Sequence, residues 1–322
     1  MGVCVAVLGL AGVVAGSQQP AGPIPPSAPQ LLILDTDIGD DIDDAFALGL
    51  VLHSPELKLL GVTTEFRDTE LRARLVDRYL GAVGRGDIPV AAGVATPHDG
   101  GMSQGAYARQ GPKTIHADGV EFLLSQIRAH PGEITLIAIG PLFNVQAAIE
   151  RDPATFKKLK RVVMMGGSVF RGYDDDKTAE RRPPDAEWNI KADPAGAKAL
   201  LGSGVAVYMM PLDSTQVRLE TENREAIFSH GSALTDQLTL LYHQWLAHRG
   251  GLGPRPVLYD PVAVAYAFRP DLCPAKPMHL DVDAQGFTRP GAGQANAQVC
   301  LESDEKGFLE LLLGRLTADP AH

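Results

Sequence analysis

Short apolar runs alternate along the chain with longer segments of helical periodicity. Runs typical of buried strands cover residues 31–34, 59–64, 88–91, 133–140, 161–165 and 205–210. Helical patterns cover residues 45–52, 69–83 and 116–128, and two further helices begin at Asn144 and Pro194. This alternation predicts βαβ units and hence an α/β fold, an open and mostly parallel Rossmann-like sheet flanked by helices.

The second half of the chain is less regular. Residues 223–248 read as one helix that breaks near residues 229–231, and Tyr259 opens an apolar helix. The last stretch is predicted to be rich in strands and to end in a helix at residues 308–316. Residues 93–114 and 168–186 are polar or glycine-rich, and loops of this length are usually functional or disordered.

The most unusual feature is a group of acids directly after the first strand. These are Asp35, Asp37, Asp40, Asp41, Asp43 and Asp44. Ligands bind at such strand-to-helix junctions in open α/β sheets. Mutual repulsion is costly without a cation, and the helix dipole offers only about 0.3–1 kcal/mol per acid. Oxygen ligands favour Ca²⁺ or Mg²⁺; the alternative is an acidic, solvated helix cap.

Two other acidic motifs match this junction poorly. An EF-hand loop requires a third acid or amide at the position of Gly39 and a helix before it, whereas here a strand precedes. Aspartyl-phosphate phosphatases also place D-x-D after a strand, but they usually carry Thr or Val at the position of Gly39. They have no use for the pair Asp43 and Asp44.

Composition and charge narrow the class of protein. The chain has 322 residues, of which 45% are hydrophobic and 21% charged, as in ordinary soluble globular proteins. The net charge of −10 argues against a nucleic-acid partner, which would need a basic face. The length suits one large α/β domain or two smaller ones.

The N-terminus has the composition of an export signal. Residues 3–15 are apolar and too short to span a bilayer. We expect a signal peptide over residues 1–17, a proline-rich linker over 18–30 and one catalytic domain over 31–318. The mature protein is then periplasmic or extracellular, without a membrane anchor. A basic segment before the apolar run is missing, so a misassigned start and a cytoplasmic protein remain the alternative.

Three cysteines bear on the compartment. Cys4 falls within the expected signal peptide, which leaves Cys273 and Cys300. In an oxidising compartment these two could form a disulfide, and in a reducing one both would be free thiols.

A series of motifs in consistent order from residue 31 to residue 316 resembles the inosine–uridine nucleoside hydrolase family. These motifs are DTDIGDDIDDA, the strand IPV, IGPLFN, VVMMGG, EWN…ADP, PLD and YDPVAVA. The resemblance implies an open α/β sheet and cleavage of the N-glycosidic bond of ribonucleosides with a tightly held Ca²⁺. It also implies a small nucleoside as partner and a homodimer or homotetramer.

The resemblance also implies roles for individual residues. The metal ligands would be Asp37, Asp44, Asp260 and the carbonyl oxygen of Phe143, with Asp43 at the same site holding a ribose hydroxyl. The further substrate-binding residues would be Asp68, Met165, Glu187, Trp188 and Asn189. The chemistry fits these residue types, because departure of the base leaves an oxocarbenium ion that carboxylates stabilise. Asp37 is the candidate general base, worth about 10²–10⁴-fold.

Departures from the family pattern keep several roles open. Two extra residues separate Gly39 from the aspartate pair, so either Asp41 or Asp43 fills the ribose-contacting role. Tyr259 is a candidate catalytic residue because it stands where many members carry a His that protonates the leaving base. A neutral phenol, with a pKa of about 10, is a poor acid at pH 7. Tyr242, His243 or Trp245 could stack on or protonate the base, unless they only pack the core.

Three functions therefore compete at this stage. The first is Ca²⁺-dependent hydrolysis of ribonucleosides. The second is a metal-dependent pentose- or nucleoside-binding protein on the same scaffold, which the tyrosine at position 259 favours and the complete acid set disfavours. The third is a phosphatase-like hydrolase.

Overall fold

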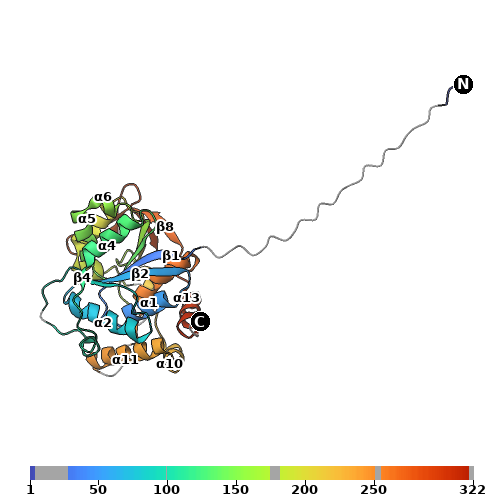
Figure 1. The fold of residues 1–322 in the computed structure, drawn as a ribbon. Helices are drawn as coiled ribbons and strands as arrows, with labels where there is room; N and C mark the ends of the chain where they lie inside the picture. The colour runs from blue at the N-terminus through green and yellow to red at the C-terminus, as the bar shows by residue number, and fades with distance from the viewer. Residues whose placement is uncertain (4–27, 99, 175–181, 251–254, 319–322) are drawn as a thin grey trace.

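The structure is a computed structural model that describes residues 1–3, 28–98, 100–174, 182–250 and 255–318 (Figure 1). The strands are β1 (Gln30–Thr36), β2 (Leu57–Thr64), β3 (Val90–Ala92), β4 (Ala117–Asp118), β5 (Thr135–Ala138), β6 (Arg161–Met165), β7 (Val207–Met210), β8 (Ala275–Met278), β9 (Leu280–Val282), β10 (Thr288–Pro290) and β11 (Ala297–Cys300). Nine of them form one sheet in the order β4-β3-β2-β1-β5-β6-β7-β11-β8. Its strands pair in parallel except at one edge, where β8 runs antiparallel to β11. The predicted α/β class is confirmed.

Helices connect the strands and cover the sheet. They are α1 (Asp43–Leu52), α2 (Thr69–Ala82), α3 (Gly105–Ala108), α4 (Gly119–Ala129), α5 (Phe143–Arg151), α6 (Pro153–Phe156), α7 (Trp188–Ala192), α8 (Pro194–Gly202), α9 (Leu212–Thr215), α10 (Thr221–Phe228), α11 (Ala233–His248), α12 (Tyr259–Phe268) and α13 (Glu305–Leu316), with a 3₁₀ turn η1 (Pro270–Leu272). One face of the sheet is covered by α4, α5 and α6, and the other by α1, α2, α10 and α11 (Figure 1).

The central strand β1 shows why its sequence is continuously apolar. Leu32 and Leu34 pack into the hydrophobic cluster that includes α1 and α2, while Ile33 packs into the cluster that includes α4 and α5. Successive side chains of a strand point to opposite faces. Because helices cover both faces, alternation with polar residues would bury polar groups, and the run is apolar instead.

Several element boundaries differ from the sequence prediction. The helix expected from residue 116 begins at Gly119, because residues 117–118 pair as β4 and the Asp118 carboxylate caps α4 by accepting the amides of Val120 and Glu121. The predicted loop over residues 93–114 contains the short helix α3. The predicted break near residues 229–231 is confirmed, since Gly231 has a φ of 77° between α10 and α11.

The two late cysteines are joined. A disulfide links Cys273, directly after η1, to Cys300, the last residue of β11. Both residues are buried. Of the two alternatives open from the sequence, the structure therefore has the paired form.

Residues 4–27 lie outside the described residues. They contain all but the first three residues of the expected signal peptide and most of the expected linker. In the part of the chain that the structure describes, no helix is both long and apolar enough to cross a membrane.

Candidate functional site

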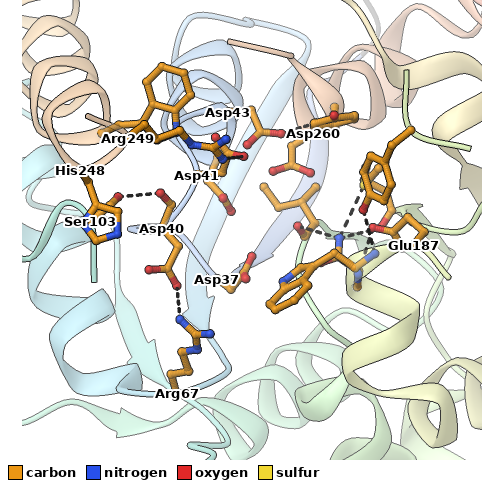
Figure 2. Close-up of a pocket in the computed structure, with 18 of the residues that line it drawn as sticks. Asp37, Asp40, Asp41, Asp43, Arg67, Ser103, Glu187, His248, Arg249 and Asp260 are labelled. Carbon is orange, nitrogen blue, oxygen red and sulfur yellow. Dashed lines mark hydrogen bonds and ion pairs between the residues drawn. The ribbon is translucent and has the colours of Figure 1, made fainter. Parts of the chain in front are cut away.

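A cavity of about 600 Å³ opens where β1, β5 and β6 end and where α1 and α12 begin. Seven carboxylates line it: Asp37, Asp40, Asp41, Asp43, Asp44, Glu187 and Asp260. All of them except Asp44 are labelled in Figure 2. Its aromatic lining residues are Tyr173, Trp188, Trp245 and Tyr259. The cavity therefore lies at the junction that the acidic motif indicated.

Three of these carboxylates could hold one metal ion. One carboxylate oxygen from each of Asp43, Asp44 and Asp260 lies within 4.8 Å of the other two, and all three residues are buried. Asp43 and Asp44 open α1, and Asp260 lies in the first turn of α12. Two helix N-termini therefore meet at this point, and Figure 2 shows Asp43 and Asp260 side by side.

The surroundings of these acids fit a hard divalent cation. The Thr36 hydroxyl donates to Asp44 at 2.5 Å, and the Asp260 amide donates to Asp43 at 3.2 Å. Burial, reinforced by the neighbouring carboxylates, raises the pKa of Asp43, Asp44 and Asp260 well above that of an ordinary aspartate. When ionised, these carboxylates repel one another, and binding of Ca²⁺ or Mg²⁺ would relieve that repulsion.

Asp37 lines the same cavity but is not a member of that group of three. Burial raises its pKa to about 6, and the positive charge of Arg72 opposes that rise. A carboxylate that is ionised at neutral pH, beside acids that could hold a metal ion and facing a substrate-sized cavity, suits a general base.

Arg72 fixes the shape of the acidic loop. This buried residue of α2 donates from Nη1 to the carbonyl oxygens of Asp37 and Ile38, the latter at 2.8 Å. Its Nη2 donates to the Asp40 carboxylate at 2.7 Å, and its Nε to the carbonyl of Phe66 at 2.9 Å. One guanidinium thus holds both the backbone of the loop and one of its acids.

Glu187 and Asn189 form the opposite wall. The Glu187 carboxylate caps α7 by accepting the amides of Asn189 and Ile190, and it also accepts the amide of Gly167 at 2.9 Å. Burial raises its pKa to about 7, against the effect of these hydrogen bonds. The Asn189 side chain donates to the carbonyl of Met165 at 3.2 Å. Both side chains are therefore held in place before a substrate arrives.

Asp40 and Asp41 form a partly exposed rim of the cavity. Asp40 pairs with Arg67 at 3.5 Å, and Asp41 pairs with Arg249 at 3.3 Å (Figure 2). Asp40 also pairs with Arg72. The Ser103 hydroxyl donates to the Asp40 carbonyl at 2.6 Å. Ion pairs and hydrogen bonds therefore hold this rim in place.

Short contacts connect this rim to α11. Gln104 donates from its side chain to the Asp41 carbonyl at 2.8 Å. In α3, Tyr107 donates its amide to Gln244 at 2.9 Å and its hydroxyl to Gln237 at 2.6 Å. The acidic loop, α3 and α11 thus form one hydrogen-bonded unit.

The structure brings most of the predicted site residues together. Those that line the cavity are Asp37, Asp43, Asp44, Met165, Glu187, Trp188, Asn189, Trp245, Tyr259 and Asp260. Three others are not among the lining residues. Asp68 caps α2 through the Leu71 amide, the Phe143 ring stacks on Phe66, and Tyr242 is buried against Phe228 and Trp245.

Sequence reasoning missed several residues of the site. His248 and Arg249 line the cavity beside Trp245. They follow Trp245 by three and four residues, which places them on the same face of α11. That spacing could have predicted that they line the cavity with Trp245. Arg72 carried no comparable signal, because its partners in the acidic loop are 32 to 35 positions away in sequence.

Comparison with known proteins agrees with the geometry. The family model for inosine-uridine preferring nucleoside hydrolases matches residues 32–310. The chain belongs to this nucleoside hydrolase family. It is 30% identical over 316 residues to the pyrimidine-specific ribonucleoside hydrolase RihA of Escherichia coli, a match that covers 88% of this chain and 97% of that protein. It is 29% identical to uridine nucleosidase 1 of Arabidopsis thaliana, over 88% of this chain and 92% of the relative.

A solved structure agrees as well. The plant nucleoside hydrolase PpNRh1 superposes with a TM-score of 0.78 and 26% identity, covering 90% of this chain and all of that one. This nucleoside hydrolase is therefore an enzyme that hydrolyses N-glycosyl bonds, and its substrates are small nucleosides.

Proposed function

We propose that this nucleoside hydrolase cleaves ribonucleosides with a Ca²⁺ ion held by Asp43, Asp44 and Asp260 and with Asp37 as general base. The observation that carries the proposal is the convergence of three buried carboxylate oxygens within 4.8 Å of one another in a cavity that Asp37 also lines. The printed names of the relatives, a uridine nucleosidase and a ribonucleoside hydrolase, support the substrate class.

The residues of the cavity divide the reaction between them. As the C1′–N bond breaks, its electron pair goes to the base, and a neutral base takes up one proton from solvent. The sugar ring carries positive charge at this point, which the surrounding carboxylates stabilise. Water then forms the new bond to C1′ and gives its proton to Asp37. Glu187 and Asn189, fixed by their own hydrogen bonds, are placed to orient the sugar. When bound, a divalent cation would neutralise the acids and orient the vicinal hydroxyls of the pentose.

The choice of Ca²⁺ over Mg²⁺ rests on the crowding of oxygen ligands. Ca²⁺ takes about six to eight oxygens in flexible geometry, whereas Mg²⁺ demands a near-octahedral shell and keeps several waters. Three carboxylates that already face one point, with Asp37 in the same cavity, match the larger ion better.

The test is a panel of purine and pyrimidine ribonucleosides with the release of free ribose as the readout. We expect turnover that disappears in excess EGTA, returns with added Ca²⁺, and falls about 10²–10⁴-fold in Asp37→Ala. Calorimetry should show Ca²⁺ binding to the wild type and much weaker binding to Asp260→Ala. Ribose-dependent thermal stabilisation without turnover would instead identify a pentose-binding protein. Turnover that resists both EGTA and Asp37→Ala contradicts the proposal.

We also propose that the chain is exported. The apolar run near the N-terminus supports this, and so does the disulfide between Cys273 and Cys300, a bond typical of oxidising compartments. Mass spectrometry of the protein purified from its native cells should find an N-terminus near residue 18. An intact N-terminus on the mature protein contradicts export by signal cleavage.

A further inference from the structure

We propose that Tyr173 is a specificity-determining residue whose phenol hydroxyl donates a hydrogen bond to the 5′-hydroxyl of the nucleoside, and that Asp213 and Gln216 position it. This inference rests on the proposed function, because it adds residues to the same site. Three observations support it: how the segment that carries Tyr173 is held, what its hydroxyl contacts, and where a bound nucleoside directs its 5′-hydroxyl.

Tyr173 lies on a segment, residues 167–174, that contains no helix or strand. The buried carboxylate of Asp213, in α9, accepts the backbone amides of Val169 and Phe170, both at 2.9 Å. Hydrogen bonds from two amides to one carboxylate are charge-assisted and stronger than bonds between neutral groups. Asp213 therefore fixes the first half of the segment, and the proposed function gives this acid no other role.

Gln216 holds the other half of the segment, on both sides of Tyr173. Its side-chain oxygen accepts the amide of Asp174 at 2.7 Å, and its side-chain nitrogen donates to the carbonyl of Gly172 at 3.0 Å. The two neighbours of Tyr173 in sequence are thus bound to one buried side-chain amide. Because side chains fix the backbone on both sides, the phenol ring keeps its place in the cavity lining without the support of a helix or strand.

The hydroxyl of Tyr173 is an acceptor that still has its proton to donate. Its oxygen accepts the amide of Trp188 at 2.9 Å, and within the described part of the chain it makes no hydrogen bond as a donor. A phenol can accept and donate at the same time. Burial raises the pKa of Tyr173, and the negative charge of Glu187 adds to the rise, so the proton stays on the oxygen at neutral pH. This donor is available to a hydroxyl of a bound sugar.

The stereochemistry of a β-nucleoside directs its 5′-hydroxyl to the side of the cavity where Tyr173 lies. The 2′- and 3′-hydroxyls project from one face of the ribose ring, and the base and the C5′ hydroxymethyl group project from the other. With the vicinal hydroxyls at the three convergent carboxylates, the 5′-hydroxyl points away from those acids. Glu187 and Asn189 form the opposite wall, and the amide of Trp188, between them in sequence, is the partner of the Tyr173 hydroxyl.

The experiment compares uridine with 5′-deoxyuridine, which keeps the base and the vicinal hydroxyls, on the full-length, Ca²⁺-loaded protein. In Tyr173→Phe, kcat/KM for uridine should fall about five- to tenfold through the loss of one hydrogen bond, and the value for 5′-deoxyuridine should change less than about twofold. The ratio of the two values cancels any effect of the variant on folding. Calorimetry in the Asp37→Asn background, with and without Tyr173→Phe, makes the same comparison through Kd, whatever the rate of turnover.

Two further variants test the positioning. Asp213→Asn puts an amide nitrogen where one backbone amide needs an acceptor, and Gln216→Leu removes both contacts beside Tyr173. In each, the ratio of kcat/KM for uridine over 5′-deoxyuridine should fall at least about threefold, and the fall should be absent once Tyr173→Phe is present, because the hydroxyl is gone. The matched control is Asp271→Asn, which removes an exposed acid that pairs with Arg269 at 2.7 Å and should leave the ratio unchanged.

Each outcome decides a separate point. An unchanged ratio in Tyr173→Phe, with uridine still cleaved, overturns the role of Tyr173 and leaves the proposed function intact. A ratio that falls in Tyr173→Phe but not in Asp213→Asn or Gln216→Leu overturns the positioning roles. Failure of the wild type to cleave any riboside overturns the proposed function, and the comparison of Kd values then still decides whether Tyr173 binds the 5′-hydroxyl.

Discussion

Arg72 shows how much of this site depends on a single buried side chain. Its guanidinium has partners at Nε, Nη1 and Nη2, and three of them are backbone carbonyls rather than acids. A lysine has no planar fork with which to reach them together. The conformation of the acidic loop therefore depends on a contact that is remote in sequence, which is why the motif indicated the acids correctly and gave no indication of what holds them.

Replacement of Arg72 by methionine should be severe. We expect the free energy of unfolding to fall by about 3–5 kcal/mol, because the Asp40 carboxylate and three carbonyls lose their buried donor. The value of kcat/KM should fall more than about tenfold as the loop loses its shape. Urea unfolding in EGTA removes any contribution of the metal. The control is Arg85→Met, which removes a partly exposed side chain that pairs with Asp87 at 3.1 Å and should cost no more than about 1 kcal/mol.

At the scale of elements, the order of strands and helices followed from the pattern of apolar runs. The pattern could not predict short helices that begin only because one side chain caps their first turn. The helix α7 has five residues, and it begins because the Glu187 carboxylate accepts the amides of its first turn. The family resemblance had assigned the Glu187 carboxylate to substrate binding, and nothing in the sequence indicated separately that it caps a helix.

The disulfide joins two segments that already lie side by side at the edge of the sheet. Cys273 precedes β8 by two residues, Cys300 pairs with Ala275 in the β11–β8 ladder, and the sequence separation of the cysteines is 27. Replacement of both cysteines by serine should lower the free energy of unfolding by about 2–4 kcal/mol, through the greater freedom of the unfolded chain. Dithiothreitol should destabilise the wild type by a similar amount and leave the double variant unchanged. A wild type that is insensitive to reductant would contradict the prediction.

At the scale of the whole molecule, stability without metal should depend on pH. Burial raises the pKa values of Asp43, Asp44 and Asp260. At any pH above the pKa of an ordinary aspartate, the folded state therefore binds more protons than the unfolded state. Asp35 and Glu187, with pKa values raised to about 7, add to the effect. The stability that these acids contribute is therefore present in full at low pH, and it is lost as the pH rises through their raised pKa values.

Calorimetry in EGTA between pH 5 and pH 8 measures this dependence. We expect the Tm of the metal-free protein to fall as pH rises, and the increase in Tm on adding Ca²⁺ to grow, because protons and the ion compete for the same oxygens. Asp44→Asn should flatten the metal-free profile. A Tm in EGTA that increases steadily over this interval would contradict the assignment of these acids as the dominant titrating groups.

The continuity between the acidic loop, α3 and α11 has a consequence for evolution and for design. The acidic loop, which would carry the ion, and α11, which contributes Trp245 to the cavity lining, are joined through Gln104 and Tyr107. A new specificity cannot be grafted by exchanging α11 alone, because Gln237 and Gln244 would leave with it. Variants that broaden the choice of base should therefore acquire compensating changes in α3, and a library should diversify the two segments jointly.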